Sequence, residues 1–294
     1  MASQTQKTAA APRKKSRLRE TCARMAKNKI AMAGFFIFAA IMTCVVLADF
    51  IVPLQYALKQ DMAERYLSPS WAHPFGTDLY GRDIFARIIH GSRNSLLLGI
   101  SAVVVGVSIG GFLGSVAGYF GGVADAVISR VLDTIMCIPF MLLALAIVAS
   151  LGTGIVNVLI ALMVAMVPYY TRVIRAAILN IVEMDFIEAA RACGASHAFI
   201  IIRHVLPNAI GTVIVQATMS VGSMIISAAA MSFLGMGIQP PAPEWGSMLS
   251  EGKDYMMTYP HMVIFPGLAI TLTALSVNLM GDGLRDALDP RLKD

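Results

Sequence analysis

The chain has 294 residues, of which 57% are hydrophobic and 14% are charged, and its formal net charge is +5. Soluble globular domains carry roughly 25% charged residues, so this composition excludes an ordinary soluble protein and indicates a polytopic membrane protein. The four cysteines form no CxxC pair, which gives no indication of a disulfide framework or a zinc site.

Long apolar runs determine the predicted architecture. A membrane-spanning helix needs about 20 predominantly apolar residues, and backbone groups inside hydrocarbon must bond within their own segment, so such runs form helices rather than strands. The predicted spans are residues 30–52, 95–117, 127–150, 155–177, 208–234 and 261–281. The sequence therefore predicts an all-α membrane protein with six transmembrane helices.

The N-terminal segment is strongly basic. Residues 1–29 hold nine lysines and arginines against the single acid Glu20. A basic tail can bind nucleic acid, but directly before a first span it more often sets topology, so we expect a cytoplasmic N-terminus and no nucleic-acid partner. No cleavable signal peptide is expected, because the first apolar run exceeds an h-region of roughly 7–15 residues. With six spans the C-terminus also lies inside, and residues up to about Ser16 are expected to be disordered.

The two longer outer loops combine turn-forming residues with polar ones. In the first, Asp78, Arg82 and Asp83 lie beside glycines in "FGTDLYGRD". This pattern predicts a capped turn that enters the second span, with contact to an extracytoplasmic partner as the alternative. In the second, a proline run precedes Glu244 and Trp245, which predicts a short interfacial helix near 245–256 with Trp245 at the membrane–water boundary.

The second and third spans carry signals for helix packing and shape. Glycines recur at every fourth position of the second span, which leaves one helix face bare and predicts close approach of a neighbouring helix. They are Gly106, Gly110, Gly114, Gly118 and Gly122. Within the third span, Pro139 lacks a backbone donor and is expected to kink the helix.

Asp133 lies near the predicted inner end of the third span. Ionisable residues within a span are functional candidates. It also follows Arg130 by three residues and lies close enough to the interface to form a local ion pair. Both interpretations stay open.

The fifth span contains a polar stripe. Gln216, Ser220, Ser223 and Ser227 follow one another at intervals of four, three and four, which places them on one helix face. Such a stripe can line an aqueous translocation path, which we favour because Gln216 is in line with the serines. It can also serve helix packing, since serines readily bond back to their own helix.

The segment "FIEAARACGASHAFIIIRHVLPN", residues 186–208, lies between two apolar spans and is too polar to insert. Small and apolar residues at 186, 189, 190 and 193 form one helical stripe that Gly194 ends. A second helix is expected over 197–206, with Pro207 at the start of the fifth span. The segment is interpreted as a cytoplasmic docking site for a partner protein. Charge pairing by Glu188 and Arg191 could set the register of the contact.

Several motifs of this chain resemble those of a known family. Glu188-Ala189-Ala190, Gly194 and the pair Leu206-Pro207 resemble the "EAA" loop of binding-protein-dependent ABC importer permeases, although His204 stands where an isoleucine is usual. The segments "FGTDLYGRD", "AGYFGG", "SFLGMGIQPPAPEWG" and "NLMGDGLRDALDPRL" are similar to the C-type permease subunit of the dipeptide, oligopeptide and nickel branch.

The resemblance implies a type I importer fold in the bacterial inner membrane. It implies a basic cytoplasmic segment at 1–29, a first transmembrane helix at 30–52, an extracytoplasmic loop at 53–92, a permease core at 93–281 with the coupling loop at 183–207, and a cytoplasmic tail at 282–294. The implied partners are a homologous B-type permease, two cytoplasmic ATPases that bind ATP and Mg, and an extracytoplasmic substrate-binding protein. The ATPase-coupling role falls on Glu188, Ala189, Ala190 and Gly194, and Arg191 is included although its position is not part of the motif.

The predicted function is therefore a non-catalytic permease subunit that forms half of the translocation path for di- and oligopeptides. Nickel, glutathione or another small peptide-like solute is the alternative cargo, and an ion-coupled carrier is the alternative class. The Gly252-Lys253 pair lacks the remaining residues of a phosphate-binding loop, so no cofactor is expected in this chain. A membrane hydrolase is disfavoured, because the sequence contains no HExxH or GxSxG motif.

Overall fold

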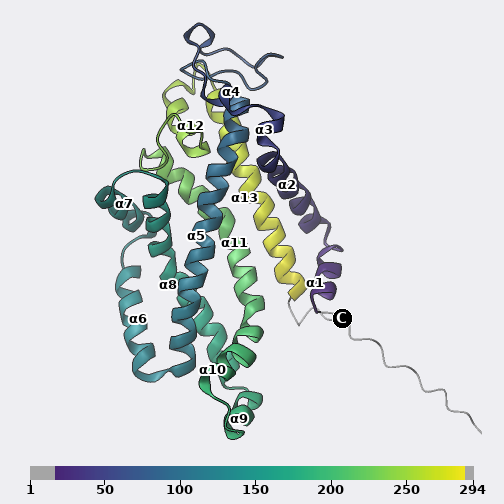
Figure 1. Ribbon diagram of the computed structural model, residues 1–294, viewed down its shortest axis with the longest axis vertical. Helices are drawn as coiled ribbons and strands as arrows, with labels where there is room; N and C mark the ends of the chain where they lie inside the picture. The colour runs from purple at the N-terminus through teal and green to yellow at the C-terminus, as the bar shows by residue number, and fades with distance from the viewer. Residues whose placement is uncertain (1–16, 289–294) are drawn as a thin grey trace, which may run out of the picture.

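The computed structural model describes residues 17–288, and within them it contains helices and no β-strand (Figure 1). The segment expected to be disordered, up to Ser16, lies outside the described residues. Five helices are long and apolar enough to cross a membrane, and a bent pair of helices makes a sixth candidate span. The predicted all-α membrane fold is thus confirmed.

Most elements follow one another closely, and the two longest connections are residues 65–83 and 234–244. In chain order they are α1 (Arg17–Met25), α2 (Lys29–Val46), α3 (Ala48–Ile51), α4 (Leu54–Leu58), η1 (Met62–Glu64), α5 (Ile84–Phe120), α6 (Gly122–Met136), α7 (Phe140–Leu151), α8 (Ile155–Val182), α9 (Asp185–Ala192), α10 (His197–Ile200), the π-helical turn η2 (Ile201–Val205), α11 (Leu206–Phe233), α12 (Trp245–Gly252), η3 (Lys253–Tyr255) and α13 (His261–Leu288).

The long helices run along one axis of the molecule (Figure 1). The short helices α4 and α12 lie at one end of the bundle, here named the α12 end. The short helices α9 and α10 lie at the opposite end, here named the α9 end. The bundle therefore presents two different surfaces, one built from loops around α12 and one from a helical hairpin.

Helix α5 is longer than the predicted span at 95–117, since it begins at Ile84 inside the predicted outer loop. The carboxylate of Asp83 accepts a hydrogen bond from the backbone N–H of Ala86 at 2.7 Å and caps the helix, as the turn pattern predicted. The first predicted span, 30–52, is interrupted at Leu47, where α2 gives way to the one-turn helix α3.

The third predicted span, 127–150, is a broken element rather than one helix. The axes of α6 and α7 differ by 85°. Pro139 stands at the break with an extended ψ of 133°. Proline has no backbone N–H and cannot donate the hydrogen bond that would continue the α-helix. The expected kink is present, and it separates α7 from α6 as a helix of its own. With 12 residues, α7 is too short to cross a bilayer alone.

Four of the five glycines in the predicted stripe let α5 and α8 touch. A Cβ built on Gly110 would lie 2.7 Å from the Tyr170 Cβ, and one on Gly114 would lie 2.7 Å from the Thr171 carbonyl oxygen. Gly106 and Gly118 are similarly close to α8. Gly122 was wrongly included, because it begins α6 after the chain has turned and has no neighbour within 4 Å.

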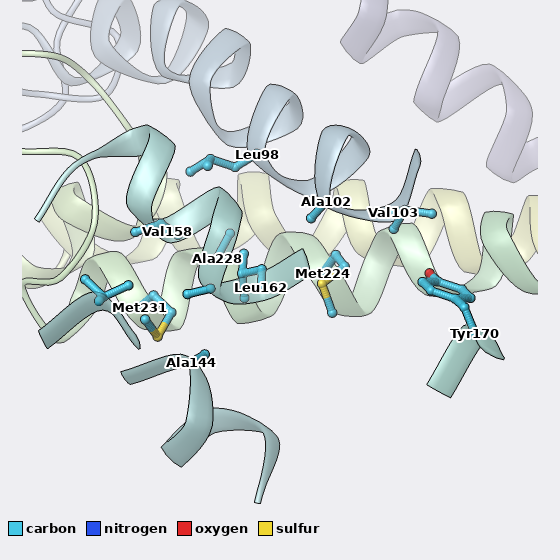
Figure 2. Packing of buried hydrophobic residues seen from close by; sticks show 12 residues of the cluster. Leu98, Ala102, Val103, Ala144, Val158, Leu162, Tyr170, Met224, Ala228 and Met231 are labelled. Carbon is cyan, nitrogen blue, oxygen red and sulfur yellow. The ribbon is translucent and has the colours of Figure 1, made fainter. Parts of the chain in front are cut away.

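A buried apolar cluster joins α5, α7, α8 and α11 (Figure 2). Alanines and bulky side chains alternate in it, so that the helices approach closely while the gaps stay filled. Its members include Leu98, Ala102, Val103, Ala144, Val158, Leu162, Tyr170, Met224, Ala228 and Met231. This cluster holds the broken helix against the rest of the bundle.

The contact between α5 and α8 predicts unequal effects of the same substitution at two glycines that lie three residues apart in α5. In Gly114→Ala the new Cβ would meet a backbone carbonyl, so we expect a loss of about 1–3 kcal/mol from overpacking. In Gly111→Ala the nearest atom is the Ile174 Cδ1 at 3.4 Å, so stability should be unchanged or slightly higher. Thermal unfolding of the two variants in lipid nanodiscs measures the difference; equal midpoints would contradict the glycine contact.

Candidate functional site

The α9 end carries the hairpin predicted as the coupling loop. Helix α9 ends in a Schellman motif, in which the Gly194 N–H donates to the Arg191 carbonyl (2.9 Å) and the Ala195 N–H donates to the Ala190 carbonyl (3.1 Å). Gly194 has a φ of +78° and nothing within 4 Å of its missing Cβ. The turn therefore needs glycine for its backbone conformation and not for space, and the predicted helix–turn–helix is present.

The buried side of α9 differs from the predicted stripe. Ile187 is fully buried in a cluster with Ile178 of α8, Ile200 of α10 and Val205 of η2, and Ala190 packs at its edge. The residues predicted as the stripe, Phe186, Ala189 and Cys193, are exposed with Glu188 and Gly194. The stripe is the outward face of α9, and Ile187 is the anchor that sequence reasoning missed.

The side chains of Arg191 and His197 connect the hairpin to the end of α5. The Arg191 guanidinium lies over the Tyr119 ring, 5.5 Å from its centroid. The Tyr119 hydroxyl is hydrogen-bonded to His197 Nδ1 at 2.9 Å. Among the described residues Glu188 forms no ion pair, so its carboxylate is free on the surface.

Helix α11 begins at Leu206, so the predicted start of the fifth span near Pro207 is confirmed, but no loop separates it from the helix before it. The helix runs from His197 through the π-helical turn η2 and Pro207 to Phe233. Pro207 lies in the first turn of α11, where a missing amide is tolerated. The hairpin is therefore continuous with a transmembrane helix and not separated from it by a loop.

A pocket of about 530 Å³ lies beside the broken helix. It is lined by the α6–α7 break and by α8 and α11, and its polar lining comes from Tyr169, Gln216, Ser220 and Ser223. Gln216 Nε2 donates a hydrogen bond to the Tyr169 hydroxyl. The predicted path residue Ser227 is not part of the lining.

The serine hydroxyls of the polar stripe bond within their own helix. Ser220 donates to the Gln216 carbonyl, Ser223 to the Ser220 carbonyl and Ser227 to the Ser223 carbonyl, all at 2.8–2.9 Å. Their protons are thus used inside α11, while the oxygens of Ser220 and Ser223 retain lone pairs on the pocket side. Both alternatives considered for the stripe therefore apply: its serines bond back to their own helix, and Ser220 and Ser223 also contribute to the polar lining of the pocket.

A half-exposed ion pair lies on the helices that form the pocket. The Arg172 guanidinium of α8 contacts the Asp133 carboxylate of α6 at 2.5 Å. The local pairing considered for Asp133 is therefore realised, but with Arg172 on another helix instead of Arg130. A second pair, Arg175 with Asp125, joins the same two helices with two bonds of 2.5 Å.

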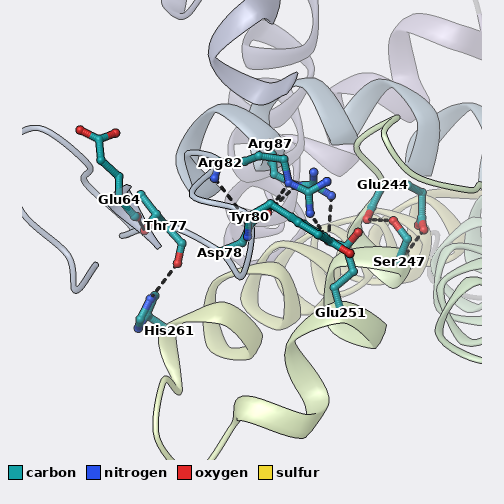
Figure 3. A network of polar contacts seen from close by, with 10 residues as sticks. All are labelled: Glu64, Thr77, Asp78, Tyr80, Arg82, Arg87, Glu244, Ser247, Glu251 and His261. Carbon is teal, nitrogen blue, oxygen red and sulfur yellow. Dashed lines mark hydrogen bonds and ion pairs between the residues drawn. The ribbon is translucent and has the colours of Figure 1, made fainter. Parts of the chain in front are cut away.

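The α12 end contains a buried charge network (Figure 3). Arg82 donates to the Asp78 carboxylate at 2.6 Å and to the Glu251 carboxylate at 2.7 Å. Arg87 donates to the same Glu251 oxygen at 3.1 Å, and both arginine side chains are only 1% exposed. The network joins the first outer loop to α12.

Glu244 and Trp245 complete the buried layer. The Glu244 carboxylate accepts hydrogen bonds from the backbone N–H groups of Gly246 (2.9 Å) and Ser247 (2.8 Å) and caps α12. Burial raises the pKa of Glu244 above its ordinary value. The Trp245 indole donates to the Ile88 carbonyl at 3.0 Å and is buried, so its predicted position at the membrane–water boundary is wrong.

The five predicted outer-loop residues therefore form an internal layer. Asp78, Arg82, Glu244 and Trp245 are buried and Asp83 is half-buried, so their geometry favours the predicted capped turn over direct contact with a partner. Sequence reasoning missed Arg87 and Glu251. The sequence signal for this network was Arg87, which lies one turn inside an apolar helix. A charge without a partner would be costly there.

The network predicts a large effect of removing its acceptor. In Glu251→Ala, Arg82 and Arg87 stay buried without that carboxylate, so we expect a loss of about 3–5 kcal/mol. Asp254→Ala is the matched control, because that side chain is exposed on the neighbouring turn and should leave stability nearly unchanged. Thermal unfolding of both variants in nanodiscs tests this; an equal effect of the two would show that the pairs contribute little.

A helical membrane bundle with a broken helix, a polar-lined pocket and a helical hairpin at one end has the architecture of a transport permease. Residues 110–294 match the family described as binding-protein-dependent transport system inner membrane component. Residues 16–69 match the N-terminal transmembrane domain of oligopeptide transport permease C. The chain belongs to the family of binding-protein-dependent transport permeases and is a multi-pass inner-membrane subunit of an ABC importer, as its motifs predicted.

Similar proteins cover nearly the whole chain. The dipeptide transport system permease protein DppC of Alkalihalophilus pseudofirmus is 43% identical over 275 residues, which are 94% of this chain and 90% of the relative. The glutathione transport system permease protein GsiD of Pectobacterium atrosepticum is also 43% identical, over 94% of this chain and 91% of the relative. The di/tripeptide permease protein DppC of Pseudomonas aeruginosa is 42% identical, over 95% and 94%.

Solved structures share the fold. An inward-facing form of the MetNI methionine ABC transporter matches with a TM-score of 0.58 at 21% identity, covering 70% of this chain and 98% of that one. An amino acid ABC transporter with histidines matches with a TM-score of 0.54 at 20% identity, covering 67% and 92%. These likenesses confirm the predicted importer permease fold.

Proposed function

We propose that this chain forms half of the translocation path of an ATP-driven importer for di- and oligopeptides. The exposed hairpin at the α9 end carries this proposal, because the chain has a built docking surface and no phosphate-binding loop of its own. Relatives that transport dipeptides, di/tripeptides and glutathione support a small peptide as cargo. Peptides are favoured over nickel, since the relatives named above are dipeptide, di/tripeptide and glutathione permeases.

The proposed assembly contains four kinds of component. A homologous B-type permease supplies the other half of the path, two ATPase subunits bind ATP and Mg, and a binding protein delivers substrate at the α12 end. The α9 end and both termini then face the cytoplasm. The basic residues before α2 support this orientation, because such residues concentrate on the cytoplasmic side of a first span.

The hairpin is suited to transmit force. Glu188 and Ala189 face outward, and a small side chain at 189 lets a partner surface come close. On the opposite side Ile187 is held among residues of α8, α10 and η2. Closure of the ATPases would therefore move α9 together with two transmembrane helices as one body, which is how alternating access is driven by rigid-body motion.

The pocket is the proposed passage for substrate through this half of the importer. It is bounded by three elements that the hairpin can move, namely the α6–α7 break, α8 and α11. Its lining is mostly apolar, with a few hydroxyl and amide groups and no charged side chain. Such a lining suits passage of varied small solutes, while selection rests with the binding protein.

The coupling role predicts that two substitutions of Gly194 differ in their effect on ATP-driven uptake. In Gly194→Pro the ring fixes φ near −65°, which is incompatible with the observed +78°, and it removes the amide that bonds to Arg191. ATP-driven uptake in proteoliposomes should fall at least about tenfold while the subunit still inserts, since a displaced coupling helix loses contact energy of more than ~1.4 kcal/mol.

Gly194→Asn is the matched control, because asparagine tolerates positive φ and the site is open, so most uptake should remain. Full ATP-driven uptake by the proline variant would exclude the hairpin as the coupling element. Uptake that continues after removal of the ATPase subunits would instead favour an ion-coupled carrier.

The passage role is tested by enlarging one serine of the stripe at a time. Ser223→Phe places a ring in the pocket lining and should reduce the maximal uptake rate, with the larger loss for longer peptides. Ser227→Phe adds the same ring one turn away, outside the lining, and should have a smaller effect. The measurement is uptake of di-, tri- and tetrapeptides at saturating binding protein; equal losses in both variants would assign the stripe to helix packing.

A further inference from the structure

The Asp133–Arg172 pair has an unusual setting for two charges. It lies in the apolar part of the chain, on helices α6 and α8, and yet 55% of the Arg172 side chain and 51% of the Asp133 side chain are exposed. Charged side chains of membrane helices avoid lipid and face a protein interior or a water-filled cavity. On this subunit, both charges are therefore open to a solute that reaches the surface of α6 and α8.

The position of the pair relates it to the pocket. Ala165 and Tyr169 line the pocket from α8, and Arg172 follows them by seven and three residues, on the same helix face. Met136 lines the pocket from α6, and Asp133 precedes it by three residues. The pair thus lies about one helical turn beyond the pocket lining, and on α8 this is the direction in which the chain continues to α9.

The chemistry of the pair suits a ligand with two opposite charges. A guanidinium can bind a carboxylate through two parallel hydrogen bonds, and a carboxylate accepts bonds from an ammonium group. A zwitterion can therefore replace each side chain as the partner of the other, so that neither protein charge is left alone. A solute with only one charge could pair with one of the two side chains only, so a zwitterion forms more charge-assisted bonds at this place.

We propose that Asp133 and Arg172 form a transient binding site for the charged termini of a zwitterionic peptide as it leaves the pocket. Asp133 takes the terminal ammonium group and Arg172 takes the terminal carboxylate, and the two side chains pair again when the peptide departs. The inference rests on the proposed peptide transport and adds the class of ligand and the two residues that meet it. It is independent of the coupling role of α9.

The same two helices carry a matched internal control. Asp125 and Arg175 form a pair of the same chemistry, with two bonds of 2.5 Å, but with side chains only 22% and 32% exposed. If charge pairs between α6 and α8 act only as structural ties, the less exposed pair should matter at least as much. If the exposed pair binds substrate, the two pairs should differ.

Cys137 provides a probe at the site. Its side chain is exposed and its Sγ lies 3.3 Å from the Asp133 carbonyl oxygen, one turn along α6. In the complete nucleotide-free importer, we would measure the rate at which a charged, membrane-impermeant methanethiosulfonate modifies Cys137, by mass spectrometry of the peptide that contains it. This readout needs neither ATP hydrolysis nor the binding protein.

Three ligands with the same dipeptide core are compared: Ala-Ala, N-acetyl-Ala-Ala and Ala-Ala amide. We expect Ala-Ala to slow the reaction, about fourfold at a concentration about three times its Kd, by simple occupancy. The two capped peptides should protect weakly at the same concentration, since each lacks one of the two charges. Equal protection by all three, or an unreactive Cys137 in the assembled importer, would overturn the proposal.

The variants then assign the effect to the residues. Asp133→Asn combined with Arg172→Gln should abolish protection by Ala-Ala, whereas Asp125→Asn combined with Arg175→Gln should retain it. Loss of protection in both would show a structural role and contradict the site. If the first variant does not assemble, the comparison of the three peptides on the unmodified importer still decides. A protected Cys137 in an importer whose uptake is insensitive to Gly194→Pro would reject the coupling proposal and leave this site standing.

Discussion

The close contact of α5 and α8 is the constraint on which the rest of the structure depends. Glycine at four successive turns of α5 brings its backbone against α8, where a single added methyl group would meet the Thr171 carbonyl. One side of α8 is thereby held by α5. The other side carries Tyr169, which lines the pocket, and Arg172, which forms the exposed ion pair with Asp133. The chain after α8 leads directly into α9. The position of α8 therefore determines where the pocket and the α9 hairpin lie relative to each other.

The two ends of the bundle use charge in different ways. At the α12 end, Arg82 and Arg87 are buried with Asp78 and Glu251, and removing charges from water in this manner is favourable only when several partners are in place. Such a network tolerates little movement and suits a rigid end. At the α9 end, most charged and small side chains of α9 remain exposed, while the buried side chain of Ile187 anchors the helix. A rigid outer layer and a firmly attached hairpin are what a rigid-body transport motion requires.

The break between α6 and α7 gives the molecule its pocket. A continuous third span would pack side by side with α8 and α11 and would leave no wall across the gap between them. Because Pro139 ends α6 and the chain turns by 85°, residues from both sides of the break form one wall of the cavity. The buried cluster that includes Ala144 and Leu162 then holds α7 in this bent arrangement (Figure 2). A single missing backbone donor thus has consequences for the shape of the pocket.

Features that depend on local spacing could be read from the sequence alone. Apolar run length predicted the helices, the four-residue glycine period predicted the α5 contact, and the residues around Gly194 predicted the helix–turn–helix. Only the tertiary structure decided the partners across the bundle, such as Arg82 with Glu251 at a separation of 169 residues and Arg172 with Asp133 at a separation of 39. It also showed that Trp245 is buried and that Ile187, rather than the predicted stripe, anchors α9. The physical reason is that helix formation and turns depend on neighbouring residues, whereas burial and charge pairing depend on which helices meet, and one sequence does not contain that geometry.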